Sequence, residues 1–295
     1  MDHHRRKDEG LTERLHRRAA LSAYSTLRRI RWTLQRRAFS ALPLAPLGAH
    51  THLAHSERLP LARSDSAAHP LLEAGKRHNV ALAIPAFHGR LLTPQRPLSF
   101  WRTLGPATLE RGYRHGMELQ AGCVVPAIGG GLCLLSNGLF RLAVHMGWEI
   151  LERHGHTTQA VPSAPGELFG LDATLYYPYV DLRIAPRSGS ARLDLSIQGD
   201  ALVISAYTDA PLPYQVSLEE EELESPAPDL RSTRLHRHLT DPSGLRLTSE
   251  VIAVTTKRLL FDEAQLKQSC LSCGQMDCHA RPSEQELAPT RALTA

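Results

Sequence analysis

A cysteine and two histidines in the middle of the chain have types and spacing that suit nucleophilic catalysis. Cys133 follows three consecutive glycines in AIGGGLCLLSNGLF, where an apolar helical pattern begins. In the first turn of a helix, the helix dipole and unpaired backbone N–H groups stabilise a thiolate over a thiol. His154 and His156 follow in ERHGHT. Because they are two residues apart, an extended chain would turn both toward one face, where either could serve as a general base or ion-pair partner.

A carboxylate in the next segment, GLDATL, completes a candidate triad. Asp172 could hold one imidazole in the tautomer that a base requires. The order of a cysteine at a helix start, then a histidine and then an aspartate on strands is also that of papain-like and transglutaminase-like folds.

Two other interpretations of the same residues stay open. Cys133 could be a small apolar residue that serves only helix packing, with the histidines as ordinary surface or core residues. A metal ion held by Cys133, His154 and His156 is the third interpretation, because thiolate and imidazole are the usual ligands of zinc.

A second group of cysteines lies near the C-terminus, in SCLSCGQMDCHAR. Its members follow the spacing C-x2-C-x4-C-H, and they are Cys270, Cys273, Cys278 and His279. This spacing could hold zinc or an iron–sulfur cluster. Adjacent Cys278 and His279 cannot both ligate easily, so a further ligand such as His236 or His238 would have to come from elsewhere. Redox or disulfide chemistry and unpaired thiols in a tail are the alternatives.

The composition predicts a globular protein in a reducing compartment. The chain has 295 residues and is 42% hydrophobic, which is enough for a packed core. Five cysteines, an odd number, do not suggest a disulfide scaffold. No apolar run approaches the roughly 20 residues of a membrane helix, and the N-terminus lacks the apolar region of a signal peptide. We therefore expect a cytoplasmic protein, peripheral to the membrane if it meets one.

The positive charge belongs to the N-terminal segment, because residues 1–40 hold eleven Lys or Arg against four Asp or Glu. Apolar residues recur at helical spacing over residues 11–38 and predict a helix there. Such a basic helix could bind an anionic membrane surface, or it could pack on its own domain through its apolar side. Nucleic acid is not an expected partner.

The rest of the pattern predicts an α+β fold in which a central helix follows a Gly-rich loop and packs on a mainly antiparallel sheet. That helix is expected over Leu132–Trp148, and an earlier helix ends near Pro85. The run Glu219–Glu222 is interpreted as a solvated strand end. Strands are predicted, besides one near Cys123–Val125, at 149–157, 172–186, 191–199, 201–209 and 214–222, with two more within 230–261.

The central block resembles the VanW family. That family carries a GGG-x-C-Q-x-S segment, then E-R-H-x-H-S, then a D-A-T strand, and residues 68–215 follow this order without large gaps. The positions that match are Gly129, Gly130, Gly131, Cys133, Ser136, Glu152, Arg153, His154, His156 and Asp172. The chain departs from the pattern at two positions, where Leu134 replaces the usual Gln and Thr157 replaces the usual Ser. Loss of the Gln amide removes one candidate oxyanion donor.

The resemblance implies a role in the cell envelope, in peptidoglycan metabolism or in glycopeptide (vancomycin) resistance, and it implies that the matching residues form one site. It brings no established activity with it. The domains expected are a basic helix at 1–40, a linker at 41–67, a VanW-like domain at 68–215, further strands of that domain at 216–262 and a Cys-rich extension at 263–295.

Three hypotheses of function follow. In the first, the protein is a cysteine-dependent acyl transferase or hydrolase acting on a peptide-like substrate, with Cys133 as nucleophile, one histidine as base and Asp172 as its orienting partner. In the second, it is a non-enzymatic module that binds a cell-wall fragment or a metal. In the third, it is a metal or redox protein centred on the C-terminal cysteines.

Overall fold

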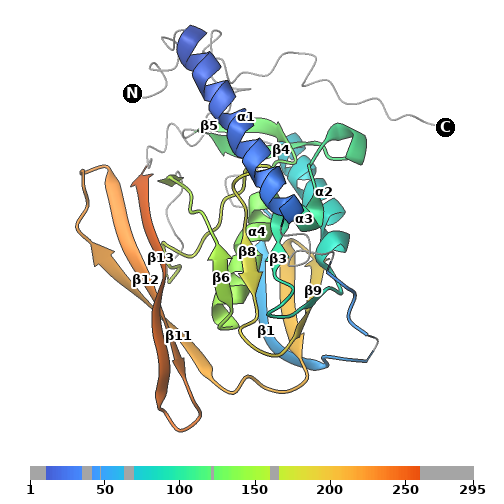
Figure 1. The fold of residues 1–295 in the computed structure, drawn as a ribbon, viewed down its shortest axis with the longest axis vertical. Helices are drawn as coiled ribbons and strands as arrows, with labels where there is room; N and C mark the ends of the chain where they lie inside the picture. Colours follow the sequence, from blue (N-terminus) through green and yellow to red (C-terminus); the bar gives the residue numbers. More distant parts are fainter. Residues whose placement is uncertain are drawn as a thin grey trace, which may run out of the picture.

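Helix α4 (Leu132–His145) lies at the centre of the fold, with strands around it (Figure 1). The structure is a computed structural model that describes residues 11–34, 42–46, 48–62, 70–120, 123–159 and 166–259. Leu135, Leu139 and Leu142 of α4 are fully buried, as their helical spacing predicts. The other helices are α1 (Leu11–Leu34), α2 (Pro70–Phe87), α3 (Phe100–Leu104) and the 3-10 turn η2 (Leu109–Arg111).

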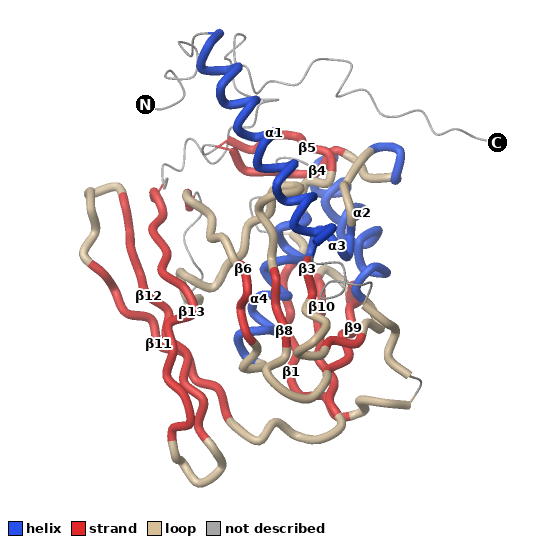
Figure 2. The backbone as a smooth tube through the Cα atoms, in the orientation of Figure 1, coloured by secondary structure: helices blue, strands red, loops and turns tan. Residues whose placement is uncertain are grey.

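The strands of the described residues form three sheets and one hairpin, which confirms the α+β class (Figure 2). The first sheet is antiparallel, in the order β1 (His52–Pro60), β10 (Ala201–Thr208), β9 (Ala191–Gln198) and β2 (Leu91–Leu92). The second has the order β11 (Gln215–Leu223), β12 (Leu230–Thr240), β13 (Arg246–Leu259) and β7 (Thr158–Gln159), of which only the last pair is parallel.

The third sheet is small and has the order β3 (Leu98–Ser99), β8 (Arg183–Ala185) and β6 (Glu149–Glu152). The hairpin consists of β4 (His115–Gln120) and β5 (Cys123–Ile128). The hairpin is connected to α4 by the glycine triplet, which directly follows β5.

The expected linker at 41–67 is wrong for residues 52–60, which form β1 at the edge of the first sheet. Its inward-facing residues include a charged one, Glu57, so the apolar alternation that would mark a strand is missing. The helix expected to end near Pro85 continues to Phe87. The N-terminal helix is confirmed as far as Leu34, beyond which its predicted end lies outside the described residues.

Two predicted strands are much shorter than expected. Within 149–157 only Glu149–Glu152 is a strand, and both site histidines follow it in irregular chain. Within 172–186 only Arg183–Ala185 is a strand, and Asp172 lies in a loop. Loops can aim successive side chains in different directions, whereas a strand would have placed the two histidines on one face.

The glycine triplet is required by close backbone packing. Gly129 and Gly131 have φ values of 77° and 99°, and Gly131 is the N-cap of α4. A Cβ on Gly130 would collide with the backbone of Gly116 in β4. The side-chain amide of Asn79 in α2 donates to the Gly130 carbonyl at 3.0 Å, which holds the glycine loop against α2. The start of α4 is therefore held in place by packed backbone.

The sheet that contains β11, β12 and β13 stands to one side of the central helix (Figure 1). A fully buried arginine, Arg237 of β12, attaches it to the end of α4. Its guanidinium donates to the carbonyls of Val144 at 3.2 Å and Trp148 at 2.7 Å, and it pairs with Glu250 at 2.8 Å. A cation on the last carbonyls of a helix also meets the negative end of its dipole.

Helix α1 docks on the domain through two side chains. Arg28 forms a bidentate pair with the Glu152 carboxylate and also donates to the Tyr179 carbonyl. Trp32 packs near the Tyr177 ring, with 6.3 Å between centroids. In the described chain no helix is long and apolar enough to cross a membrane. Several apolar residues of α1 stay exposed, namely Tyr24, Leu27, Ile30 and Leu34.

Substitution of Gly130 tests the role of the glycine loop. We expect Gly130→Ala to lower the free energy of unfolding by about 2 kcal/mol or more, because the new methyl group overpacks rigid backbone. Gly170→Ala is the matched control, since a Cβ there would make only ordinary contacts from 3.5 Å outward. Urea unfolding of both variants measures the difference, and equal losses would contradict the close-packing account.

Candidate active site

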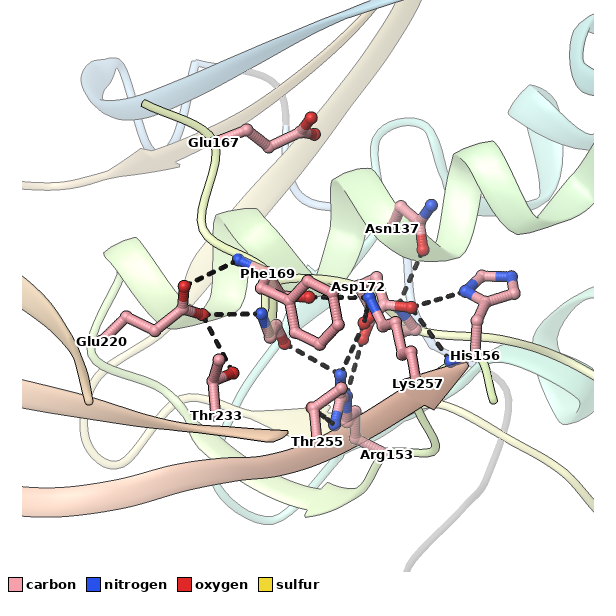
Figure 3. Close-up of polar contacts among 12 residues, drawn as sticks. Asn137, Arg153, His156, Glu167, Phe169, Asp172, Glu220, Thr233, Thr255 and Lys257 are labelled. Atoms are coloured by element: carbon pink, nitrogen blue, oxygen red, sulfur yellow. Dashed lines mark hydrogen bonds and ion pairs between the residues drawn. The ribbon is translucent and has the colours of Figure 1, made fainter. Parts of the chain in front are cut away.

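Asp172 is the centre of a polar network that joins segments far apart in the sequence (Figure 3). Its Oδ2 accepts from the backbone N–H of His156 at 3.0 Å and lies 2.5 Å from His156 Nδ1. Its Oδ1 lies 2.7 Å from Arg153 Nη2 and 3.2 Å from Lys257 Nζ. Burial alone would raise the pKa of Asp172, but the hydrogen bond from His156 and these cations lower it well below its usual range.

His156 is held as an imidazolium. Burial alone would lower its pKa, but the hydrogen bonds with Asp172 and Cys133 and the negative charge of Asp172 raise the pKa of His156 to about 9. Because Nδ1 is occupied by Asp172, Nε2 is the ring nitrogen left for the thiol. The His156 side chain is 35% exposed, so solvent screens part of this interaction.

Cys133 is the second residue of α4 and is partly accessible to solvent. Its sulfur lies 4.0 Å from the Thr174 hydroxyl, two residues after Asp172. The structure thus brings Cys133, His156 and Asp172 together in the order that the sequence suggests. At neutral pH the raised pKa of His156 makes it a charge partner and proton donor rather than a free base.

His154 does not share the position of His156. Its side chain is 47% exposed, and its Nε2 lies 3.4 Å from Glu152 Oε1. The expectation that both histidines face one way is therefore wrong, because the chain between them is irregular. Burial would raise the pKa of Glu152, but hydrogen bonds with His154 and Arg28 lower it to about 2. Among the described residues, the group of potential metal ligands whose atoms lie close together consists of His55, Glu57 and His145. This group includes none of the three residues Cys133, His154 and His156.

Arg153 supports the loop that carries Asp172. Its guanidinium donates to the carbonyls of Asp172 at 2.6 Å and Gly170 at 2.8 Å, as well as to the Thr255 hydroxyl at 3.1 Å. Its charged plane also lies over the Phe140 ring of α4, 5.3 Å from the centroid. Arg153 is therefore a positioning residue for the Asp172 carboxylate.

Two residues of the sheet that contains β11, β12 and β13, called the outlying sheet below, also belong to the network (Figure 3). Lys257 of β13 is buried, and it donates to the Phe169 carbonyl at 2.7 Å as well as pairing with Asp172. Glu220 of β11 accepts from the backbone N–H groups of Phe169 at 3.1 Å and Gly170 at 2.8 Å. The interpretation of the run Glu219–Glu222 as solvated is therefore wrong for Glu220, whose alternate position on the strand turns it inward.

Two polar residues of α4 hold the chain after Asp172. Ser136 is fully buried and donates to the Ala173 carbonyl at 2.6 Å. Asn137 accepts from the Ala173 N–H at 2.7 Å. Asn137 stands four residues after Cys133, on the same helix face, so helical spacing could have identified it. Lys257 and Glu220 had no such local signal.

The C-terminal group, Cys270, Cys273, Cys278 and His279, lies outside the described residues, so its metal or redox role stays a prediction. Its proposed additional ligands have other partners. His236 Nε2 lies 3.0 Å from Glu221, and His238 Nε2 lies 3.3 Å from Glu219.

The fold and site define an α+β protein in which a central helix presents a cysteine to a histidine–aspartate pair. A central part of the chain is similar to the VanW family. Residues 75–207 match the family model described as VanW like protein, which lies within the range that the sequence motifs suggested. No solved structure matches the chain significantly.

Two curated relatives are similar to part of the chain. The chain is 31% identical over 115 residues to the vancomycin B-type resistance protein VanW of Enterococcus faecalis, a match that covers 39% of this chain and 42% of that protein. It is 28% identical over 134 residues to the uncharacterized protein YoaR of Bacillus subtilis, covering 45% and 43% respectively. The matches thus span less than half the length of either relative.

The raised pKa of His156 predicts a pH-dependent stability. A raised folded-state pKa contributes stability that is fully present below about pH 6.5, the unfolded value, and that is lost as the pH rises through about 9. The stability difference between wild type and His156→Gln should therefore shrink by about 1 kcal/mol over this window, after discounting for solvent exposure. Urea unfolding across the window measures it. His154→Gln is the control and should follow wild type, whereas parallel curves for His156→Gln would contradict the assignment.

Proposed function

We propose that the protein is a cysteine-dependent acyl transferase or hydrolase that acts on a peptide-like substrate of the cell envelope. The observation that carries this proposal is the position of His156 between the Asp172 carboxylate and Cys133. A link to peptidoglycan precursors or to glycopeptide resistance rests on the name of the Enterococcus faecalis relative.

The proposed mechanism starts from a thiolate–imidazolium pair. The Cys133 sulfur attacks the carbonyl carbon of the substrate and forms an S–C bond. The imidazolium of His156 then gives its proton to the departing amine as the C–N bond breaks. Water, or the amine of a second substrate, then attacks the thioester carbon and gives its proton to the neutral His156, and the C–S bond breaks to release Cys133 as a thiolate. Asp172 keeps the ring oriented throughout, as the third member of a triad does.

Oxyanion stabilisation would come from the start of α4. The first backbone N–H groups of a helix lack partners within the helix and lie at the positive end of its dipole. Leu132 and Leu134 donate theirs to the glycine loop, which leaves the Cys133 N–H as the candidate donor. Leu134 cannot supply the amide that family members carry at this position, so we expect backbone donors to carry this role.

The arrangement invites comparison with papain-like and transglutaminase-like folds, in which a cysteine also begins the central helix. We infer a shared logic of cysteine, histidine and aspartate in chain order, which is an analogy of arrangement. The protein would work in the cytoplasm. Contact with a membrane surface would run through α1, where the exposed apolar residues and the exposed Arg29 support that expectation.

A binding module is the second candidate. The aromatic rings of Tyr176 and Tyr179 lie 5.0 Å apart shortly after the site loop, and Tyr176 is exposed. Exposed rings of this kind could pack against a cell-wall fragment. In this case Cys133 would line a pocket without reacting. A metal or redox role of the C-terminal cysteines stays a third prediction.

Alkylation of Cys133 separates the enzyme from the binding module. With iodoacetamide at neutral pH, and with Cys133 identified by peptide mass spectrometry, we expect the folded protein to react readily. His156→Gln should slow the reaction by about tenfold or more, because the thiolate loses its cationic partner. His154→Gln is the matched control and should keep the wild-type rate. Equal rates in all three proteins, or a Cys133 that reacts only after unfolding, would reject the enzyme.

Trapping of an acyl group tests the reaction itself. Incubation with peptide thioesters that mimic peptidoglycan stems should add the acyl mass to the Cys133 peptide in wild type, and the label should be absent in Cys133→Ser. Acylation with turnover supports transfer or hydrolysis. Saturable binding of the same peptides with no acyl adduct would favour the binding module.

A further inference from the structure

A second cluster of side chains with metal-ligating chemistry lies at the far end of α4. His55 and Glu57 stand two residues apart on β1 and face the same side of that strand. His145 is the last residue of α4. Candidate ligand atoms from the three residues all lie within 4.8 Å of one another. The Asp172 network is at the other end of the helix, so the cluster serves no part of the proposed acyl chemistry.

The distances suit one small ion. Around a tetrahedral zinc ion with bonds of about 2.0–2.1 Å, ligand atoms lie about 3.3 Å apart. Glu57 Oε1 lies 2.7 Å from His55 Nε2 and 3.7 Å from His145 Nε2, close to that spacing on both sides. The two imidazole rings stack at 4.7 Å between centroids. The candidate ligand atoms of the two histidines lie within 4.8 Å of each other.

The Glu57 carboxylate lies within reach of both imidazoles. Glu57 itself is only 8% exposed. A buried carboxylate between two imidazoles is an expensive arrangement unless something holds it there.

Arg141 supplies part of that support. Its Nε donates to Glu57 Oε2 at 3.1 Å, and its Nη1 lies 3.4 Å from Glu167. This bond fixes the carboxylate from behind and leaves Oε1 directed to the histidines. The arrangement resembles the support that ligating carboxylates receive from residues around a metal site. Glu57 can therefore keep Arg141 and ligate an ion at the same time.

We propose that His55, Glu57 and His145 bind one divalent transition-metal ion of the zinc class. Two imidazoles and one carboxylate leave a fourth tetrahedral position open to water. Because β1 and α4 each contribute ligands, the bound ion would join the edge strand of the first sheet to the end of the central helix.

Cobalt substitution of the full-length protein tests this site. After chelator treatment, Co²⁺ is titrated into wild type, His145→Gln and His52→Gln, and bound metal is counted by mass spectrometry. Wild type should bind one equivalent of Co²⁺ whose absorption spectrum shows only the visible bands that nitrogen and oxygen ligands produce. His145→Gln should lose that equivalent. His52, exposed on the same strand, is the matched control, and His52→Gln should keep it.

The spectrum separates this site from the C-terminal cysteines. Cobalt bound by thiolates adds an intense near-ultraviolet charge-transfer band, which His145→Gln should leave unchanged. His55→Gln provides a second variant, and circular dichroism confirms that each variant is folded. Equal metal content and equal visible bands in wild type, His55→Gln and His145→Gln would overturn the proposal.

Discussion

The ionised carboxylate of Asp172 is the interaction on which the site depends. A charge removed from water is tolerated only when several donors replace its hydration. Here those donors come from the loop after β6, from the imidazole of His156 and from Lys257 on a distant strand. The bond between Asp172 and His156 also places the imidazole near the start of α4, where Cys133 lies.

Local pattern predicted those parts of the fold that depend on neighbouring residues. The period of the leucines predicted α4, and spacing and motif identified Cys133, the pair His154 and His156, and Asp172 as candidates without deciding between the two histidines. Strand β1 was missed because polar residues with specific partners take the inward positions that apolar ones usually occupy. Lys257 and Glu220 were missed for another reason. Their role arises only when strands far apart in sequence approach the Asp172 loop, and no local periodicity encodes that approach.

The outlying sheet extends the site beyond the region that the family model matches. Residues 75–207 include Cys133, His156 and Asp172, whereas Glu220 and Lys257 follow later in the chain. Arg237 from the same sheet donates to the carbonyls of Ala143 and Val144 in the last turn of α4. The sheet therefore contacts the C-terminal end of α4 through Arg237 and the Asp172 carboxylate through Lys257, and both of these charged side chains are buried. Such contacts fix orientation more sharply than apolar packing, because they have defined partners and angles.

The central helix carries a cysteine in its first turn and a histidine at its last residue. From Cys133 to His145 the rise of an α-helix amounts to about 18 Å. The packed glycine backbone holds one end of the helix, and Arg237 donates to the Val144 carbonyl near the other. The helix therefore fixes the separation between the proposed nucleophile and the proposed metal site.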